Sequence, residues 1–254
     1  MALTLTPLLN IPLVKPGDDL AALIVAALGS QGLVLESGDI LVVAQKIVSK
    51  AEGRFVNLAT VNPSREAVDL AQQVDKDARL IELVIQESKR ILRFRPGTII
   101  VEHRLGFVCA NAGIDHSNVS GQIEGEECVL LLPENPDASA QELRVRLEEM
   151  CDVQLGILII DSHGRAWRMG TAGVAIGISG MPGLVDLRGE PDLFGYTLRI
   201  TQVGAADELA SAASLVMGQA AEGTPVVHVR GFPYELREGH LSELIRPEEQ
   251  DLFR

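Results

Sequence analysis

Residues 153–165 read VQLGILIIDSHGR, an apolar run that stops at an acidic residue, Asp161. A short, continuous apolar run between turn residues is typical of a strand that is buried on both faces. Residues 39–44, DILVVA, follow a Ser-Gly turn and have the same pattern. The sequence therefore predicts two buried strands, and the strand at 153–160 leads directly into a polar segment that begins with Asp161.

Segments with helical periodicity alternate with further strand-like runs along the chain. We expect helices at 19–32, 64–73, 78–92, 139–150 and 205–220, and further strands at 98–104, 106–110, 128–132, 196–203 and 224–231. Because helices and strands interleave irregularly, the sequence predicts a mixed α/β (α+β) fold rather than regular βαβ repeats.

Three intervening segments receive specific interpretations. Residues 45–54 are interpreted as a polar continuation of strand 39–44. The proline-rich residues 133–139 are interpreted as a loop, with Ser139 and Glu142 as a capping box for the next helix. The glycine-rich residues 169–183 are interpreted as a closely packed backbone or a flexible substrate loop.

Length and composition narrow the class of protein. The chain has 254 residues, 46% of them hydrophobic, and a formal net charge of -13, which predicts a folded protein with one large domain or two lobes. Nucleic-acid binding needs clustered lysine and arginine, so the expected ligands are small molecules. No apolar stretch is long enough to span a bilayer and the three cysteines are far apart. We therefore expect a cytoplasmic protein with reduced thiols and no membrane partner.

Two strand-like runs end in an aspartate followed by small polar residues. Residues 106–118, GFVCANAGIDHSN, contain Asp115, and residues 153–165 contain Asp161 with Ser162 beside it. If both strands lie in one sheet, these carboxylates converge at its edge, where hard cations are commonly bound by oxygen ligands. The alternative is that each aspartate only caps a turn. His116 and His163 follow the aspartates in the chain, and exposed loop histidines are favoured there over metal ligands.

Few cations are available for an anionic substrate. Lys50 follows strand 39–44, so its ammonium group can either bind a phosphate or lie in solvent. Arg165 and Arg168 come shortly after Asp161 and can either neutralise the carboxylates or hold a substrate anion. The sequence contains no GxxxxGK motif followed by Ser or Thr, no GxGxxG and no GxSxG. These absences argue against a Walker-type phosphate loop, a dinucleotide fingerprint and a serine hydrolase.

Five ordered segments together resemble one family, the coenzyme F420-0:L-glutamate ligases, also called γ-glutamyl ligases. The segments are IPLVKPGDDL, DILVVAQKIVSKAEGR, NAGIDHSNV, IIDSHGRAWRMGTAGVAIGISG and VMGQAAEGTPVVHVRG, between residues 11 and 231. The resemblance implies an unusual mixed α/β fold in two lobes within one catalytic unit, residues 1–254, and a homodimer. It also implies that GTP and Mg²⁺ or Mn²⁺ drive the addition of L-glutamate to a deazaflavin precursor, F420-0, with further γ-linked glutamates possible.

The resemblance also assigns site residues, which are named here by their positions in this sequence. The positions that match nucleotide contacts are Ile11, Pro12, Leu13, Val14, Gln45, Lys46, Lys50, Asn118, Met217, Gly218, Gln219, Ala220, Ala221, Glu222, Gly223 and Thr224. The positions that match metal ligands are Asp115, Asp161, Ser162 and Gln219. Gln219 stands where some relatives carry a carboxylate, and Gln45 and Lys46 replace small hydroxyl residues.

A ligase of this type must make a carboxylate electrophilic. The simplest route transfers the γ-phosphoryl group of GTP to that carboxylate, after which the glutamate amine attacks the acyl phosphate. Lys50 is the candidate for neutralising phosphate, and Arg165 and Arg168 are candidates for the precursor's phosphodiester or the incoming glutamate. The alternatives are a metal-dependent phosphotransferase or phosphohydrolase acting on another acceptor, and a non-catalytic nucleotide-binding protein.

Overall fold

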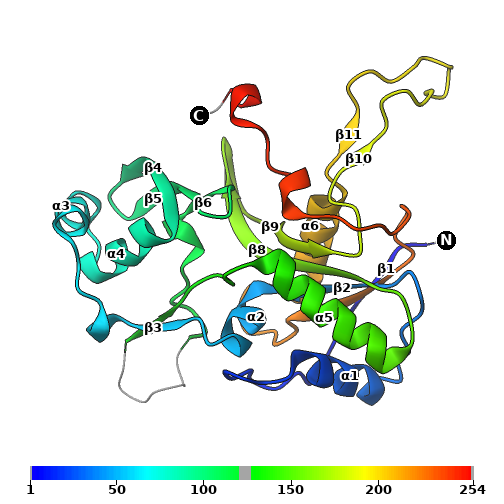
Figure 1. Ribbon diagram of the computed structural model, residues 1–254, viewed down its shortest axis with the longest axis horizontal. Helices are drawn as coiled ribbons and strands as arrows, with labels where there is room; N and C mark the ends of the chain where they lie inside the picture. Colours follow the sequence, from blue (N-terminus) through cyan, green and yellow to red (C-terminus); the bar gives the residue numbers. More distant parts are fainter. Residues whose placement is uncertain (1, 120–126, 253–254) are drawn as a thin grey trace.

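The computed structural model describes residues 2–119 and 127–252, and its centre is a five-stranded sheet (Figure 1). The strand order is β1 (Thr4–Pro7), β12 (Val226–Arg230), β2 (Ile40–Ala44), β8 (Gly156–Arg165) and β9 (Arg168–Ser179). Strands β2 and β8 are parallel, and the other neighbours are antiparallel. The two apolar runs of the sequence are therefore adjacent strands, with β2 in the middle of the sheet.

Helices cover both faces of this sheet and explain why the two central strands are apolar throughout. Helices α1 (Leu20–Ser30) and α5 (Pro136–Cys151) lie against one face, and α6 (Ala205–Met217) lies against the other (Figure 1). Side chains alternate along a strand, so Leu41 and Val43 pack with α1 and α5 while Ile40 and Val42 pack with α6. We call the sheet and these helices the main lobe.

A second group of elements, which we call the side lobe, lies to the left in Figure 1. Helices α3 (Arg65–Val74) and α4 (Ala78–Gln86) pack on a three-stranded sheet and share a hydrophobic core with it. The strands of that sheet are β4 (Ser88–Arg95), β5 (Thr98–His103) and β6 (Val108–Ala110). A two-stranded ribbon of β3 (Phe55–Asn57) and β7 (Cys128–Leu130) joins the lobes.

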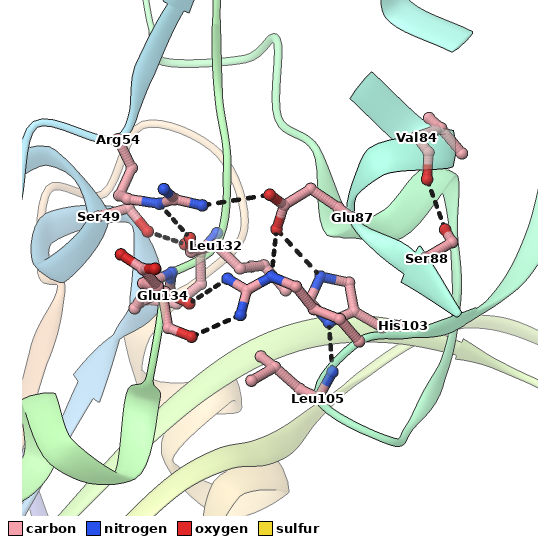
Figure 2. Close-up of polar contacts among 12 residues, drawn as sticks. Ser49, Arg54, Val84, Glu87, Ser88, His103, Leu105, Leu132 and Glu134 are labelled. Carbon is pink, nitrogen blue, oxygen red and sulfur yellow. Dashed lines mark hydrogen bonds and ion pairs between the residues drawn. The ribbon is translucent and has the colours of Figure 1, made fainter. Parts of the chain in front are cut away.

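A cluster of hydrogen bonds and ion pairs around Glu87 connects the side lobe to the segments that lead into the main lobe (Figure 2). The Glu87 carboxylate, just after α4, accepts hydrogen bonds from Arg104 Nε at 2.8 Å and from Arg54 Nη2 at 3.4 Å. The same guanidinium groups donate to main-chain carbonyls, Arg54 to Leu132 at 2.9 Å and Arg104 to Glu134 at 2.6 Å. We call Arg54, Glu87, His103 and Arg104 the Glu87 cluster.

The remaining elements are short. Strands β10 (Val185–Asp186) and β11 (Gln202–Val203) pair at the base of a long hairpin that projects from the molecule, at the upper right of Figure 1. The 3-10 helices are η1 (Leu58–Thr60), η2 (Asn111–Gly113), η3 (Leu241–Glu243) and η4 (Glu248–Gln250). Within residues 2–119 and 127–252, no helix is long and apolar enough to cross a membrane.

The mixed α/β class and the two buried strands are confirmed, but one strand prediction and two helix predictions need correction. Residues 45–51 form helix α2 (Gln45–Ala51) instead of extending the strand, because Ile47 and Val48 pack into the core beneath α1. The helix predicted at 78–92 ends at Gln86, and the chain then pairs with β5 as strand β4. Helix α5 begins at Pro136 with Asn135 as its N-cap, so the capping box at Ser139 is wrong.

The strand predictions also need correction around the hairpin of β8 and β9. Residues 169–179 are mostly strand β9, so the flexible-loop interpretation is wrong for them. Close backbone packing is confirmed, because a Cβ added at Gly173 would lie 2.4 Å from the Ala210 carbonyl and one at Gly177 would lie 2.5 Å from that of Pro136. Of the strand predicted at 196–203, residues 202–203 form strand β11, and Thr197 makes an isolated bridge with Pro191.

Candidate functional site

The candidate site lies at the carboxyl ends of the parallel strands β2 and β8. The pairing of these strands ends where Ala44 faces Ile160, and β8 then continues while β2 turns into helix α2. Beyond this point β8 is still paired with β9 but no longer with β2, which leaves space beside Asp161 and Ser162. Open α/β sheets commonly bind ligands at this kind of position.

A cavity of about 850 Å³ occupies this space. Its lining contains every residue that the resemblance assigns to the nucleotide or the metals: Ile11, Pro12, Leu13, Val14, Gln45, Lys46, Lys50, Asp115, Asn118, Asp161, Ser162, Met217, Gly218, Gln219, Ala220, Ala221, Glu222, Gly223 and Thr224. The fold thus brings together residues from five separate sequence segments.

Asp115 reaches this cavity by a different route from the one that the sequence suggested. Strand β6, which precedes Asp115, belongs to the side-lobe sheet, so the condition that the two strands lie in one sheet is not met. The main chain of Asp115 is instead fixed by two hydrogen bonds with Leu130, each 2.9 Å long. Asp161 therefore comes from strand β8 of the central sheet, whereas Asp115 comes from the segment after β6 that pairs with the end of β7.

The carboxylate of Asp115 is half-buried and is held by two side chains from α2. Gln45 Nε2 donates to its Oδ2 at 2.7 Å, and Lys46 Nζ lies 3.2 Å from its Oδ1. Burial raises the pKa of Asp115, and the negative charge of Asp161 raises it further, while Lys46 and Gln45 only partly oppose these effects. Two carboxylates that repel each other across one cavity form a site that a cation would stabilise.

Asp161 has a different environment. Its Oδ2 lies 3.0 Å from Nε2 of His163. Burial raises the pKa of Asp161, but the hydrogen bond and charge of His163 lower it by more, so the net pKa lies below its ordinary value. Asp161 is therefore ionised at neutral pH.

A second hydrogen-bonded chain lines the cavity beside Asp161. Ser162 Oγ donates to Gln219 Oε1 at 2.9 Å, and Gln219 Nε2 donates to Ser214 Oγ at 2.8 Å. The amide of Gln219 is thereby oriented with its oxygen toward Ser162. The loop that carries Gln219 is closed by Thr224, whose Oγ1 donates to the Met217 carbonyl at 2.9 Å.

Helix α2 places two lysines on the cavity wall, one turn apart. Lys46 Nζ also lies 3.0 Å from Ser117 Oγ. Burial lowers the pKa of Lys50, and the charge of Lys46 lowers it further, while Asp115 opposes the shift. Two neighbouring cations are better balanced when an anion such as a phosphate is bound between them.

The oxygen atoms at this site fit a hard divalent cation. Asp115 and Asp161 offer carboxylates, Ser162 a hydroxyl and Gln219 an amide oxygen, all lining the same cavity. Oxygen-only ligand sets suit Mg²⁺ or Mn²⁺ rather than zinc. Among the described residues, no group of three or more His, Cys, Asp and Glu side chains could hold a metal, so a cation here would also need the neutral oxygens or its substrate.

Two predicted residues lie apart from the cavity. Arg165 and Arg168 pair with each other at the tip of the β8–β9 hairpin, and neither lines the cavity. Both are exposed, and Arg165 Nη2 donates to the Met169 carbonyl at 3.3 Å. No ion pair between these arginines and the aspartates is found in the described structure.

One residue of the site was missed by the sequence reasoning. His163 was expected to be an exposed loop residue, yet it lies within β8, lines the cavity and is 9% exposed. The available signal was the spacing of two from Asp161, which places both side chains on one face if the strand continues. The corresponding expectation for His116 is confirmed, since it is exposed.

Comparison with known proteins gives one consistent match. Residues 8–231 match the family described as F420-0:Gamma-glutamyl ligase. The chain is 46% identical over its whole length to a protein of Methanothermobacter thermautotrophicus that is also fully covered and is named "Coenzyme F420:L-glutamate ligase". A protein of Methanopyrus kandleri with the same name is 48% identical over 95% of this chain and 93% of its own length. A third, from Archaeoglobus fulgidus, is 41% identical over 100% and 97%.

Proposed function

This chain belongs to the F420-0:gamma-glutamyl ligase family and is a ligase, and from that premise we propose that it joins L-glutamate to the deazaflavin precursor F420-0 at the expense of GTP. Magnesium or manganese is the proposed metal. Further glutamates would then follow through γ-linkages. The names of the relatives support the ligase activity, and the nucleotide, metal and mechanism are our proposals.

The observation that supports the nucleotide and metal proposal best is the composition of the cavity. Residues that are far apart in the sequence, such as Leu13, Lys50, Asn118 and Gln219, line one space of about 850 Å³. Ligand cavities of a few hundred to a thousand cubic ångströms accommodate molecules the size of a nucleotide. The volume of the cavity thus suits a ligand the size of GTP.

In this proposal, Asp115, Asp161, Ser162 and Gln219 hold the metal ions. A bound divalent cation would neutralise the charge that develops on the phosphate oxygens during phosphoryl transfer. Lys46 and Lys50 contribute positive charge from α2, where their mutual repulsion is relieved by the phosphates. The loop at 217–224 lies along the nucleotide.

The proposed chemistry has two steps. The acceptor carboxylate attacks the γ-phosphorus of GTP, the bond to the β-phosphate oxygen breaks, and GDP leaves. The amine of L-glutamate then attacks the acyl carbon, the carbon–oxygen bond to phosphate breaks, and inorganic phosphate leaves as the amine loses its proton. Positioning of three anionic substrates carries much of the rate, so a cavity rich in fixed polar groups suits this reaction.

Arg165 and Arg168 are proposed to act at the rim rather than inside the cavity. The hairpin that carries them continues from Ser162 and Gly164, which line the cavity, so its tip lies where the outer part of a long acceptor would emerge. We propose that they bind the phosphodiester of the precursor or the carboxylates of the incoming glutamate. Unchanged Michaelis constants for both co-substrates in Arg168→Ala would contradict this role.

The experiment that tests the function is incubation with GTP, Mn²⁺, L-glutamate and F420-0, followed by mass spectrometry. We expect a product heavier by one glutamyl unit, with GDP formed only when glutamate is present, and no product from Asp161→Asn. GTP loss without glutamate would instead identify a phosphohydrolase. Tight nucleotide binding without turnover would identify a binding protein.

We also propose that the protein is a homodimer that uses the long hairpin based on β10 and β11. Beyond that base, Leu193, Phe194 and Ile200 are 99%, 95% and 87% exposed. Large apolar side chains gathered on a projecting segment are typical of a protein interface. A second copy of this chain is the proposed partner.

A further inference from the structure

The histidine of the cavity, His163, occupies a position that the proposed reaction does not yet use. It follows Asp161 by two residues on β8, so both side chains project from the same face of the strand. Its Nε2 lies 3.0 Å from Asp161 Oδ2, and its side chain is 9% exposed. A buried contact of this length between an imidazole and a carboxylate fixes the orientation of both groups.

The direction of the hydrogen bond follows from the chemistry of the two groups. Carboxylate oxygens accept hydrogen bonds, so we assign the tautomer of His163 in which Nε2 carries the hydrogen and donates a hydrogen bond to Oδ2. One oxygen of Asp161 is therefore engaged by the protein, and the rotation of the carboxylate about its own axis is restricted.

The ring of His163 is itself held by aromatic packing. Phe107 lies against it with ring centroids 5.2 Å apart and planes tilted by 49°. On its other side, Phe107 stacks on His103 with centroids 5.1 Å apart and planes 7° from parallel. We call His103, Phe107 and His163 the ring column.

The far end of the ring column is anchored in the side lobe (Figure 2). His103 is fully buried, its Nδ1 accepts a hydrogen bond from the Leu105 main chain at 3.1 Å, and its Nε2 lies 3.7 Å from Glu87 Oε2. Burial lowers the pKa of His103 to about 3, so this ring is neutral and packs as an aromatic group. The column thus connects the Glu87 cluster to Asp161.

We propose that His163 is a positioning residue whose Nε2–H holds Asp161 in the orientation that binds the divalent cation, with the ring column keeping the imidazole in place. The inference rests on the proposed function, because it presumes that Asp161 is a metal ligand. Ligands of metal ions are commonly oriented by a hydrogen-bonded partner of this kind, and loss of the partner typically weakens metal affinity by about 10- to 100-fold.

Two substitutions separate the hydrogen bond from the packing. His163→Gln places an amide nitrogen near the position of Nε2 and so keeps a donor, but it removes the ring. His163→Phe keeps an aromatic ring against Phe107 but removes the donor. His163→Leu serves as a second variant without a donor if the phenylalanine ring prevents folding.

The measurement is the dissociation constant of Mn²⁺ for the full chain without substrates, followed by the EPR signal of free Mn²⁺. We expect about 10- to 100-fold weaker binding in His163→Phe and only a few-fold change in His163→Gln. We also expect saturating Mn²⁺ to restore most of the turnover of His163→Phe. The reverse order of the two variants, or unchanged affinity in both, would overturn the proposal.

A direct role of His163 as a metal ligand is a separate outcome of the same experiment. It predicts a large loss in both variants, together with a nitrogen coupling to Mn²⁺ in pulsed EPR of the wild-type protein, and either finding would overturn the positioning role. Failure of the proposed function is distinguishable from both, because the wild-type protein itself would then bind no Mn²⁺ in this cavity.

Discussion

Aspartates with restricted access to solvent lie near both ends of the parallel strand pair, and their hydrogen-bond partners differ. Asp39, just before β2, accepts hydrogen bonds from His228 Nε2 at 2.8 Å and from Arg230 Nε at 2.9 Å. Asp115, at the opposite edge, is left with a raised pKa because burial and the charge of Asp161 outweigh its partners. A half-buried carboxylate whose charge is not balanced within the chain is expected at a binding site.

Asp39→Asn is predicted to destabilise the fold without touching the cavity. Burial raises the pKa of Asp39, but hydrogen bonds from Arg230 and His228 lower it by more, below its ordinary value of 3.8. The unfolded chain therefore binds this proton more readily, so the stabilisation is present above pH 3.8 and is lost as the pH falls through the lowered pKa. Urea unfolding at pH 7 should give a free energy of unfolding for Asp39→Asn that is about 3 kcal/mol lower than that of the wild type. Between about pH 5 and 3, the free energy of unfolding of the variant should change less with pH than that of the wild type.

The matched control is Glu36→Gln, which removes an exposed ion pair to the same arginine. Glu36 Oε1 lies 2.7 Å from Arg230 Nη1, but its side chain is 66% exposed. Exposed pairs contribute less than about 1 kcal/mol, so this variant should unfold nearly as the wild type does. Equal losses in the two variants would show that burial of Asp39 is not the reason for the effect.

At the scale of single residues, the sequence predicted most of the residues that line the candidate site, but it missed His163, which contacts Asp161. Every proposed nucleotide and metal position was assigned from short ordered motifs, and the residues at these positions line one cavity. His163 was missed because its role depends on β8 running past Asp161, which an apolar pattern that ends at Ile160 does not reveal. The rings of His103 and Phe107 are brought to it only by the packing of the side lobe.

At the scale of elements, apolar periodicity predicted the central strands and the helices that cover them, and it failed where tertiary pairing decides. Residues 88–92 continue the helical pattern of α4, yet they pair with β5. Residues 168–179 are rich in glycine, yet they form β9 by pairing with β8, and their glycines allow α5 and α6 to approach the sheet closely. Neither requirement is visible in the local sequence.

The end of helix α6 gives a prediction at this scale. Gly218 caps the helix with φ 74° and ψ -178°, a conformation that is essentially restricted to glycine. A Cβ there would lie 2.2 Å from Glu222 Cδ and displace the carboxylate that accepts from the Ala220 main chain at 2.8 Å. Gly218→Ala should cost about 1–3 kcal/mol of stability and, because the loop at 217–224 must shift, should weaken GTP binding in calorimetry.

Gly29→Ala is the control for this substitution. Gly29 lies within helix α1, and an added Cβ would meet no atom within 4 Å. Alanine is favoured over glycine in a helix, so this variant should gain about 0.5–1 kcal/mol and leave GTP binding unchanged. If Gly218→Ala behaved in the same way, the conformation of the loop would not depend on glycine.

At the scale of the whole molecule, the two lobes are joined by few covalent connections and by the Glu87 cluster. Glu87→Gln keeps the shape of the side chain but removes the charge that Arg54 and Arg104 share. Loss of hydrogen bonds to a charged group predicts about 1.5–3 kcal/mol of destabilisation. Hydrogen exchange should rise first in β4 and β5, which lie beside the cluster, before it rises in the five-stranded sheet.

Asp69→Asn is the matched control for the Glu87 variant, because the Arg65–Asp69 pair lies on the exposed face of α3 with side chains 95% and 64% exposed. This variant should change the free energy of unfolding by no more than a few tenths of a kcal/mol and should leave the pattern of hydrogen exchange unchanged. An equal increase in hydrogen exchange across both lobes of Glu87→Gln would mean that the lobes unfold as one unit. The Glu87 cluster would then not stabilise the contact between the lobes locally.

The proposed homodimer is the last prediction at this scale. Each copy of 27.3 kDa carries a formal charge of -13, so two copies repel each other and the apolar hairpin must supply the attraction. We expect sedimentation equilibrium to give twice the monomer mass and a dissociation constant that falls as salt screens the repulsion. Replacement of Leu193 and Phe194 by serine should give monomers, whereas Val34→Ser, at an exposed apolar residue elsewhere, should not. A dimer that survives the double replacement would assign the interface to another surface.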